Sequence, residues 1–257
     1  MLFVSASYGN DSLALIQWLH ARGYAPESHI IYADTGWARE SWKLRVEIME
    51  CWARSLGFAT HRTASEGFEA LVRRKKGWPR QGIQFCTQHL KIEPVNTMQD
   101  AIDPERRGIV VIGKRRAESA NRAQTPEFIE SDPYNGGRRV WHPLYLHTDE
   151  DRDALLHEVG IPVLPHRSDE CWPCINANKA DIMRLAHDIP RVDFIRRLEV
   201  DLGYTSKGKP RLMYRPYRYR GAKGIDAMIR WAKTDRGADF DDGTGNDCQY
   251  GAAGCGT

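Results

Sequence analysis

The sequence predicts an α/β protein with a doubly wound, mostly parallel sheet and a C-terminal helical, basic extension. Short apolar segments and amphipathic segments alternate over the first two-thirds of the chain. That alternation is typical of a parallel sheet covered by helices on both faces. Polar turns follow the apolar segments directly, and the last third changes to helical segments and a run rich in lysine and arginine.

Apolar periodicity and end signals predict the elements of the first half. Two strands and two helices come first, at residues 2–4, 11–22, 29–33 and 40–56. A weaker strand, a short helix, a helix beginning near Pro94 and the most apolar strand follow at 58–62, 68–76, 91–101 and 109–113. The helix over 40–56 is expected to bury Leu44, Ile48, Cys51 and Trp52, which makes Cys51 a predicted core residue.

The second half is predicted to begin with an excursion loop over 124–139, which contains Pro126, Pro133 and two adjacent glycines. A return to the sheet over 140–144 and a helix over 149–159 capped by Thr148 follow. The last expected helices lie near 177–187, 191–202 and 224–233. We therefore expect a nucleotide-binding domain over 1–165, an extension over 166–235 and a mobile tail over 236–257.

Composition excludes a membrane span and points to a soluble protein. The chain has 257 residues, a hydrophobic share of 41% and a net charge of +3. No apolar run approaches the roughly 20 residues that cross a bilayer, and the first strand begins too early for a signal peptide. A cytoplasmic location is expected, where cysteines serve as ligands, nucleophiles or core residues more often than as disulfides.

The turn after the first strand is a candidate phosphate site. Residues 5–12 are small and polar, and a helix follows them. A strand, a small-residue turn and a helix present free backbone N–H groups and a positive helix end to a phosphate. Gly9 permits close approach, and Ser7 and Ser12 supply hydroxyl groups. The alternative is an ordinary turn in which Asp11 caps the helix.

Three polar turns are expected to share one crevice, because ligands of open parallel sheets bind at the carboxyl ends of the strands. They are residues 5–12, 34–36 and 113–122. Asp34 is predicted to contact ribose or a metal ion. Four cations of the third turn are predicted to hold phosphate or sulfate: Lys114, Arg115, Arg116 and Arg122.

A pair of cysteines predicts a metal or redox site. Cys171 and Cys174 flank Trp-Pro, a spacing that aims two sulfurs at one metal. Soft thiolates favour zinc or an iron–sulfur cluster. The pair supplies half a site, and the candidates for the other half are Cys86, Cys248, Cys255, His89 and His166.

Residues 207–220 interleave basic side chains with tyrosines. This composition suits a phosphate backbone with stackable bases, so DNA or RNA is a candidate partner. The alternative is a solvated extension whose tyrosines cover the core.

Four stretches resemble the phosphoadenosine phosphosulfate (PAPS) reductase family of the adenine nucleotide alpha-hydrolase-like fold, also called the PP-loop ATP pyrophosphatase superfamily. Ser7-Tyr8-Gly9-Asn10-Asp11-Ser12 resembles the family's pyrophosphate loop, with Tyr8 in place of the first glycine. Asp34-Thr35-Gly36 matches the acidic turn after the second strand. The other two stretches are Cys86 to Pro94 and Gly113 to Ala123, and the resemblance covers roughly residues 1–175.

The resemblance implies functional residues by position. The implied catalytic residues are Asp11, Lys91, Arg115 and Cys255. The implied nucleotide contacts are Ser7, Tyr8, Gly9, Asn10, Asp11, Ser12, Asp34, Thr35, Gly113, Arg115, Arg116, Glu118, Ser119 and Arg122. Relatives of the iron–sulfur type hold a 4Fe-4S cluster, and Cys86, Cys171 and Cys174 match three of its ligands. Phe85 replaces the remaining one, so either the cluster has an open iron or a tail cysteine such as Cys248 completes it. The third alternative is zinc held by Cys171, Cys174, Cys248 and Cys255, with Cys86 left free.

The resemblance implies an enzyme that cleaves an adenine nucleotide at its α-phosphate. The retained Asp11 and Ser12 favour an ATP pyrophosphatase, with Mg²⁺ held by Asp11 or Asp34. Such an enzyme activates an acceptor, including a nucleic-acid base, for attack from a sulfur donor. The second hypothesis is a sulfonucleotide reductase that makes sulfite from PAPS or APS, with Cys255 as nucleophile and a thioredoxin-like reductant. The third is a non-enzymatic, zinc-containing module that binds a nucleotide or a nucleic acid.

Overall fold

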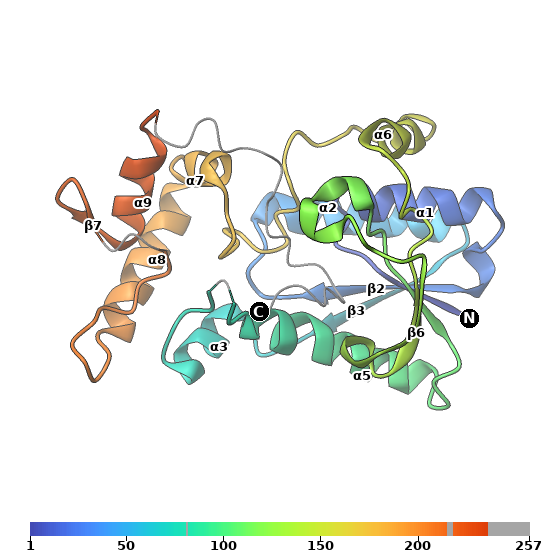
Figure 1. Cartoon of the computed structure of the whole chain (residues 1–257), viewed down its shortest axis with the longest axis horizontal. Helices are drawn as coiled ribbons and strands as arrows, with labels where there is room; N and C mark the ends of the chain where they lie inside the picture. Colours follow the sequence, from blue (N-terminus) through green and yellow to red (C-terminus); the bar gives the residue numbers. More distant parts are fainter. Residues whose placement is uncertain (81, 215–217, 236–257) are drawn as a thin grey trace.

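A six-stranded sheet in the order β3-β2-β1-β4-β6-β5 forms the centre of the protein (Figure 1). The computed structural model describes residues 1–80, 82–214 and 218–235. Five strands run parallel, namely β1 (Leu2–Ser5), β2 (Ser28–Asp34), β3 (Ala59–Ala64), β4 (Ile109–Val111) and β6 (Arg138–Trp141). The sixth, β5 (Phe128–Asp132), pairs antiparallel with β6 at the edge. The predicted α/β class with a mostly parallel sheet is confirmed.

Helices cover both faces of the sheet, because successive strand residues point to opposite sides. Leu2 and Val4 of β1 pack in the cluster that contains α1 (Asn10–Ala21), α2 (Glu40–Ser55) and α6 (Asp149–His157). Phe3, between them, packs in the cluster of α5 (Glu93–Ile102) on the other face. The two layers are visible above and below the strands (Figure 1).

The C-terminal part is helical and shares a hydrophobic cluster with the first half. It comprises α7 (Lys179–Leu185), α8 (Ile189–Leu202), the hairpin of β7 (Arg218–Tyr219) and β8 (Ala222–Lys223), and α9 (Gly224–Ala232). These helices pack with Trp37, with Trp78 and with Phe68 of α3 (Phe68–Lys75). The Trp78 indole N–H also donates to the carbonyl of Arg211 at 3.1 Å. The C-terminal helices lie at one end of the molecule (Figure 1).

Short helical segments complete the described structure. They are α4 (Phe85–Thr87), the π-helical segment η2 (Gln88–Ile92), and the 3-10 turns η1 (Ala25–Glu27), η3 (Arg116–Glu118), η4 (Ala120–Arg122) and η5 (Pro133–Asn135). None of the described helices is both long enough and apolar enough to cross a membrane.

The prediction for the buried face of α2 is wrong for three of its four residues, whereas Trp52 is half-buried and packs against the core. Leu44 and Ile48 are 59% and 52% exposed, and Cys51 is exposed as well. The buried residues are Trp42, Val46, Glu50 and Ala53. The Trp42 indole donates to the Ser7 carbonyl, which orients this face toward β1. Glu50 tolerates burial because it accepts a hydrogen bond from Arg62 at 2.8 Å.

The excursion loop predicted over 124–139 is also wrong, because it contains β5 and the start of β6. Ile129 pairs with Val140 in the ladder. The prolines that suggested a loop lie outside β5, at positions 126 and 133. Proline is compatible with strand ends at the sheet edge, where one side of the ladder has no partner strand. The helix cap at Thr148 is confirmed, since its hydroxyl accepts from the Asp151 N–H.

Candidate functional site

A pocket of about 930 Å³ opens at the carboxyl ends of the parallel strands. The turn after β1 contributes Ser7 to Ser12 apart from Tyr8, and the turn after β2 contributes Thr35. The segment after β4 contributes residues 113 and 115–120. The sequence order of the strands reverses between β1 and β4, which is where open α/β sheets bind ligands. The prediction that the three turns share one crevice is confirmed.

The first turn directs the start of α1 toward the pocket. Trp42 and Arg45 of α2 donate side-chain hydrogen bonds to the carbonyls of Ser7 and Tyr8, at 3.1 and 2.9 Å. The N-cap of α1 is Gly9, and no side chain caps the helix. The backbone N–H groups in the first helical turn of α1 have no partner within the helix. The N-terminal end of α1 is therefore suited to binding an anion. Asp11 lies inside the helix and does not cap it, contrary to the alternative prediction.

Tyr8 supports the turn from beneath. Its side chain is fully buried, lies 5.9 Å from the Tyr32 ring and is absent from the pocket lining. Burial raises the pKa of its phenol far above the ordinary value. Its φ of +58° is unusual for a residue with a side chain and indicates local strain. A glycine at this position would adopt that conformation freely.

Asn10 and Ser12 line the pocket. Their side chains also form hydrogen bonds with backbone groups that lie close to them in space. The Asn10 amide donates to the Leu164 carbonyl at 2.9 Å and accepts the Leu164 N–H at 3.0 Å. The Ser12 hydroxyl donates to the Gly9 carbonyl at 3.1 Å. The Ser7 hydroxyl accepts the Gly9 N–H at 3.4 Å. These bonds fix the loop to the segment that leads to Cys171.

Arg115 is the buried centre of a charge network on the pocket wall. It is 1% exposed, and it donates to Asp11 at 2.7 Å and to Asp149 at 2.8 Å. Burial by itself lowers the pKa of Arg115, but the two carboxylates outweigh burial and raise it. Arg152 of α6 joins the network, 3.1 Å from Asp149. Arg115 therefore ties the first turn to α6.

The remaining residues of the third turn have different surroundings. Arg116 is exposed, lines the pocket and donates to the Thr125 carbonyl at 2.8 Å. Arg122 is buried beside Glu118 as its ion-pair partner and is absent from the lining. Glu118 also accepts the Arg115 N–H at 2.7 Å. Lys114 is absent from the lining too, whereas Ser119 belongs to it.

Gly113 allows β4 to approach the start of α1. A Cβ at this position would lie 2.9 Å from the Asp11 carbonyl oxygen, which is closer than real Cβ contacts. A side chain here would therefore push the two turns of the pocket apart.

The turn after β2 places Thr35 rather than Asp34 in the pocket. Asp34 is exposed, and its carboxylate accepts the Gly36 N–H at 2.9 Å, which closes the turn. Thr35 is fully buried, and its hydroxyl donates to the Glu170 carbonyl at 2.8 Å. The expected contact of Asp34 with a ligand stays a prediction.

A buried ion pair and three thiols line the other part of the pocket. Lys91 pairs with Glu170, and both side chains are nearly inaccessible. Cys86, Cys171 and Cys174 line the same pocket. Burial raises the pKa of the Cys171 thiol far above its ordinary value. The Cys171 thiol lies 3.8 Å from the Thr35 hydroxyl, and the Cys174 sulfur accepts the Asn176 N–H at 3.5 Å.

The three thiols predicted to ligate a metal line one pocket, but they form no metal site within the described residues. The three thiols reach one pocket, and their chemistry suits a soft metal. Within residues 1–80, 82–214 and 218–235, however, no three Cys, His, Asp or Glu side chains converge closely enough to hold an ion. Cys248 and Cys255 lie outside the described residues. The cluster, the zinc alternative and the nucleophile at Cys255 stay predictions.

Sequence reasoning missed several pocket residues that approach from distant parts of the chain. They include Asp149 and Arg152 of α6, and Leu164, Pro165, Arg167, Ser168 and Glu170. His166, a predicted candidate ligand in the same segment, also lines the pocket. Asp149 and Arg152 appeared only as the first turn of a capped helix. Glu170 immediately precedes the predicted ligand Cys171 in the sequence. This adjacency was the one available signal that Glu170 lies at the site.

The solved structures include similar proteins. One is phosphoadenylyl-sulfate (PAPS) reductase from Candida auris in its phosphate complex, with 16% identity and a TM-score of 0.45 over 63% of this chain and 74% of that chain. FMN adenylyltransferase from Candida glabrata is also similar, in complexes with FAD and inorganic pyrophosphate and with FMN and the ATP analog AMPCPP. Those two comparisons give 12% and 13% identity and TM-scores of 0.41 and 0.38 over 63% of this chain.

The present chain spans about half the length of the adenylyltransferase, 50% and 49% in the two structures. The curated proteins contain no match to this chain. The family model described as the phosphoadenosine phosphosulfate reductase domain matches residues 1–177. That match covers more than half of the chain and contains the first turn, Thr35, Lys91, Arg115 and both cysteines of the later pair. The chain belongs to the phosphoadenosine phosphosulfate reductase domain family.

Proposed function

We propose that this protein is an adenine-nucleotide-dependent enzyme that cleaves ATP to AMP and pyrophosphate in order to activate an acceptor. An acceptor oxygen attacks the α-phosphorus, the bond from that phosphorus to the bridging oxygen breaks, and pyrophosphate leaves. A sulfur or nitrogen nucleophile then displaces AMP from the adenylated acceptor. The family membership and the uncapped start of α1 in the pocket support this proposal.

The observation that carries the proposal is that the N-terminus of α1 lies at the wall of a large pocket. Gly9 is the N-cap without a side-chain cap, and the carbonyls before it are held by α2. The helix end therefore attracts a polyphosphate. Arg116 adds positive charge from another wall, and this charge supports binding of the phosphates. The charge of Arg152 is offset by its ion pairs with Asp149 and Asp153.

The pocket is large for a site that binds a single ligand. Pockets for one drug-sized ligand range from about 300 to 1,000 Å³, and this pocket of about 930 Å³ lies near the upper end. The phosphate turn occupies one part of the wall, and Phe68, Leu90 and the three thiols occupy another. We assign the second part to the acceptor, which would place it beside the thiols.

Pyrophosphate release from ATP tests the proposal. The Gly9→Ala variant is expected to fold, because its Cβ would make one tight contact, 3.3 Å from the Ser168 Cβ, which a shift of a few tenths of an ångström relieves. It narrows the approach to the loop, so nucleotide affinity and pyrophosphate release should fall at least tenfold. The matched control is Gly77→Ala, whose Cβ has no neighbour closer than 4.0 Å and which is absent from the pocket lining. ATP binding that is unaffected in Gly9→Ala would refute this assignment.

The family description favours a second candidate, reduction of PAPS or APS to sulfite. In this reaction a cysteine thiolate attacks the sulfur, the nucleotide leaves, and a thioredoxin-like dithiol reduces the resulting enzyme S-sulfocysteine to release sulfite. The three pocket thiols are compatible with an anionic sulfonucleotide. Thioredoxin-dependent sulfite formation that disappears in Cys255→Ser would establish this reaction instead, and ATP pyrophosphatase activity without sulfite would exclude it.

A further inference from the structure

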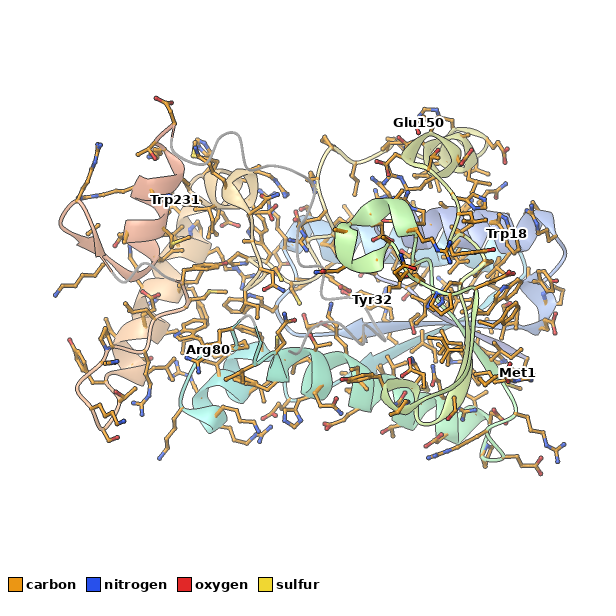
Figure 2. The ribbon with its side chains drawn as sticks, in the orientation of Figure 1. Met1, Trp18, Tyr32, Arg80, Glu150 and Trp231 are labelled. Carbon is orange, nitrogen blue, oxygen red and sulfur yellow. The ribbon has the colours of Figure 1, made fainter. Side chains whose placement is uncertain are left out.

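A basic face on α9 lies outside the pocket and has no role in the chemistry proposed above. Lys223, Arg230 and Lys233 are exposed and line a shallow depression of about 510 Å³. Lys223 precedes α9, Arg230 lies in its last turn and Lys233 follows it, and the shared depression brings the three side chains together. We call these three residues the α9 basic face. It belongs to the C-terminal part, where Trp231 is labelled, far from Met1 (Figure 2).

No carboxylate among the described residues neutralises the α9 basic face. Asp226 lines the same depression, but Arg196 holds it with bonds of 2.5 and 3.1 Å. Arg230 donates to the Arg220 carbonyl at 2.5 Å and forms no ion pair within the described residues. Surface arginines elsewhere do pair, for example Arg73 with Glu69 at 2.8 Å. Three like charges that form no ion pair with the described residues attract a polyanion.

Hydrogen bonds to a buried carboxylate hold the backbone beneath the α9 basic face in place. The buried carboxylate of Glu199 accepts the N–H groups of Met213 and Ile225, at 3.0 and 3.2 Å. A Cβ at Gly224 would clash with that carboxylate, so the start of α9 cannot shift without losing these bonds. Arg230 holds the hairpin turn through the Arg220 carbonyl. The cations are therefore displayed on a preorganised surface, which reduces the entropy lost on binding.

The spacing of the charges suits a nucleic-acid backbone. Ten residues separate Lys223 from Lys233, which is about 15 Å along a helix at 1.5 Å per residue. That length corresponds to about four phosphates of one duplex strand at 3.4 Å per step. Elsewhere in the C-terminal part Lys207 and Lys209 are exposed cations, and Tyr204 is 66% exposed.

We infer that the α9 basic face binds the phosphate backbone of a nucleic acid. The inference does not depend on the nucleotide chemistry, because binding is measured without ATP. If both proposals hold, the bound strand supplies the acceptor. DNA and RNA share the recognised phosphate, and the probes below distinguish them.

The test is fluorescence anisotropy with labelled 20-nucleotide single-stranded DNA, RNA of the same sequence, and the DNA duplex, over a series of salt concentrations. The double variant Lys223→Gln/Lys233→Gln removes two of the proposed lysine–phosphate contacts. The magnitude of the slope of log K against log salt should fall by about 1.8 for the duplex and about 1.4 for single strands. At 0.1 M salt the corresponding loss of affinity is on the order of 25- to 60-fold. The matched control Lys43→Gln/Arg107→Gln removes the same charge elsewhere on the surface and should bind like the wild type.

Other outcomes overturn the inference. Equal losses in both double variants would indicate only a general effect of charge. Absence of wild-type binding to all three probes at 50 mM salt would also contradict it. If the variant kept its affinity but changed the oligomeric state in size-exclusion chromatography, the face would instead be an interface between copies. Pyrophosphate release with a small acceptor should be unchanged in Lys223→Gln/Lys233→Gln, so failure of this inference is distinguishable from failure of the proposed function.

Discussion

Replacing Arg115 with methionine tests the charge network that joins the first turn to α6. Arg115 is 1% exposed and bridges Asp11 and Asp149. Breaking a buried ion pair by removing one partner costs about 3 to 5 kcal/mol, because an uncompensated charge remains. The lower end applies here, since the side chains of Asp11 and Asp149 are 23% and 61% exposed and retain some solvation.

We therefore expect Arg115→Met to reduce the free energy of unfolding by about 3 kcal/mol. For a chain of this size, that loss lowers Tm by roughly 6 to 12 °C. Nucleotide affinity should fall as well, because Asp11 and the first turn lose their fixed position. Urea unfolding gives the free energy, and a thermal scan gives Tm.

Two companion variants make this expectation refutable. Asp149→Asn should cost less than about 1 kcal/mol, because pairs with an exposed partner contribute little. In a double-mutant cycle, Arg115→Met and Asp11→Asn should show a coupling energy of about 1 to 3 kcal/mol. The reasoning fails if Arg115→Met costs less than 1 kcal/mol, or if the two substitutions are additive.

Three further predictions concern buried groups and the thiols. Tyr8→Phe should be neutral or stabilise the protein by about 1 kcal/mol, because the buried phenol oxygen has no hydrogen-bond partner in the described structure; a clear loss of stability in urea unfolding would contradict this. Burial lowers the pKa of His142 from 6.5 to about 4, so the unfolded chain takes up a proton first as the pH falls. The native state should lose about 3 kcal/mol between pH 6.5 and pH 4, and His142→Gln should lack this share of the pH dependence. Anaerobic purification with iron, sulfide and zinc analysis should find about four irons per chain if a 4Fe-4S cluster is present; one zinc without iron would favour the zinc alternative, and Cys171→Ser/Cys174→Ser should lose either metal.

The sequence predicted the class of fold because the signals for it are local. Alternating apolar strands and amphipathic helices placed β1, β2 and β4 nearly at their observed positions. Local patterns failed where a tertiary contact decided the outcome. The α2 helix has two apolar stripes, and the bond from Trp42 to the Ser7 carbonyl selects the stripe that is buried. Residues 128–132 become a strand because β6 offers a free edge.

The candidate site divides in the same way. The sequence by itself determined the three turns and the cysteine pair, because each is a short motif whose residue types carry the chemistry. Only the tertiary structure decided which of those side chains reach the pocket. Arg115 is buried between carboxylates that lie far apart in the chain, and Asp34 bonds to its own turn. Ion pairing and burial depend on neighbours that are distant in sequence, so a local motif can name a residue but cannot determine where its side chain points.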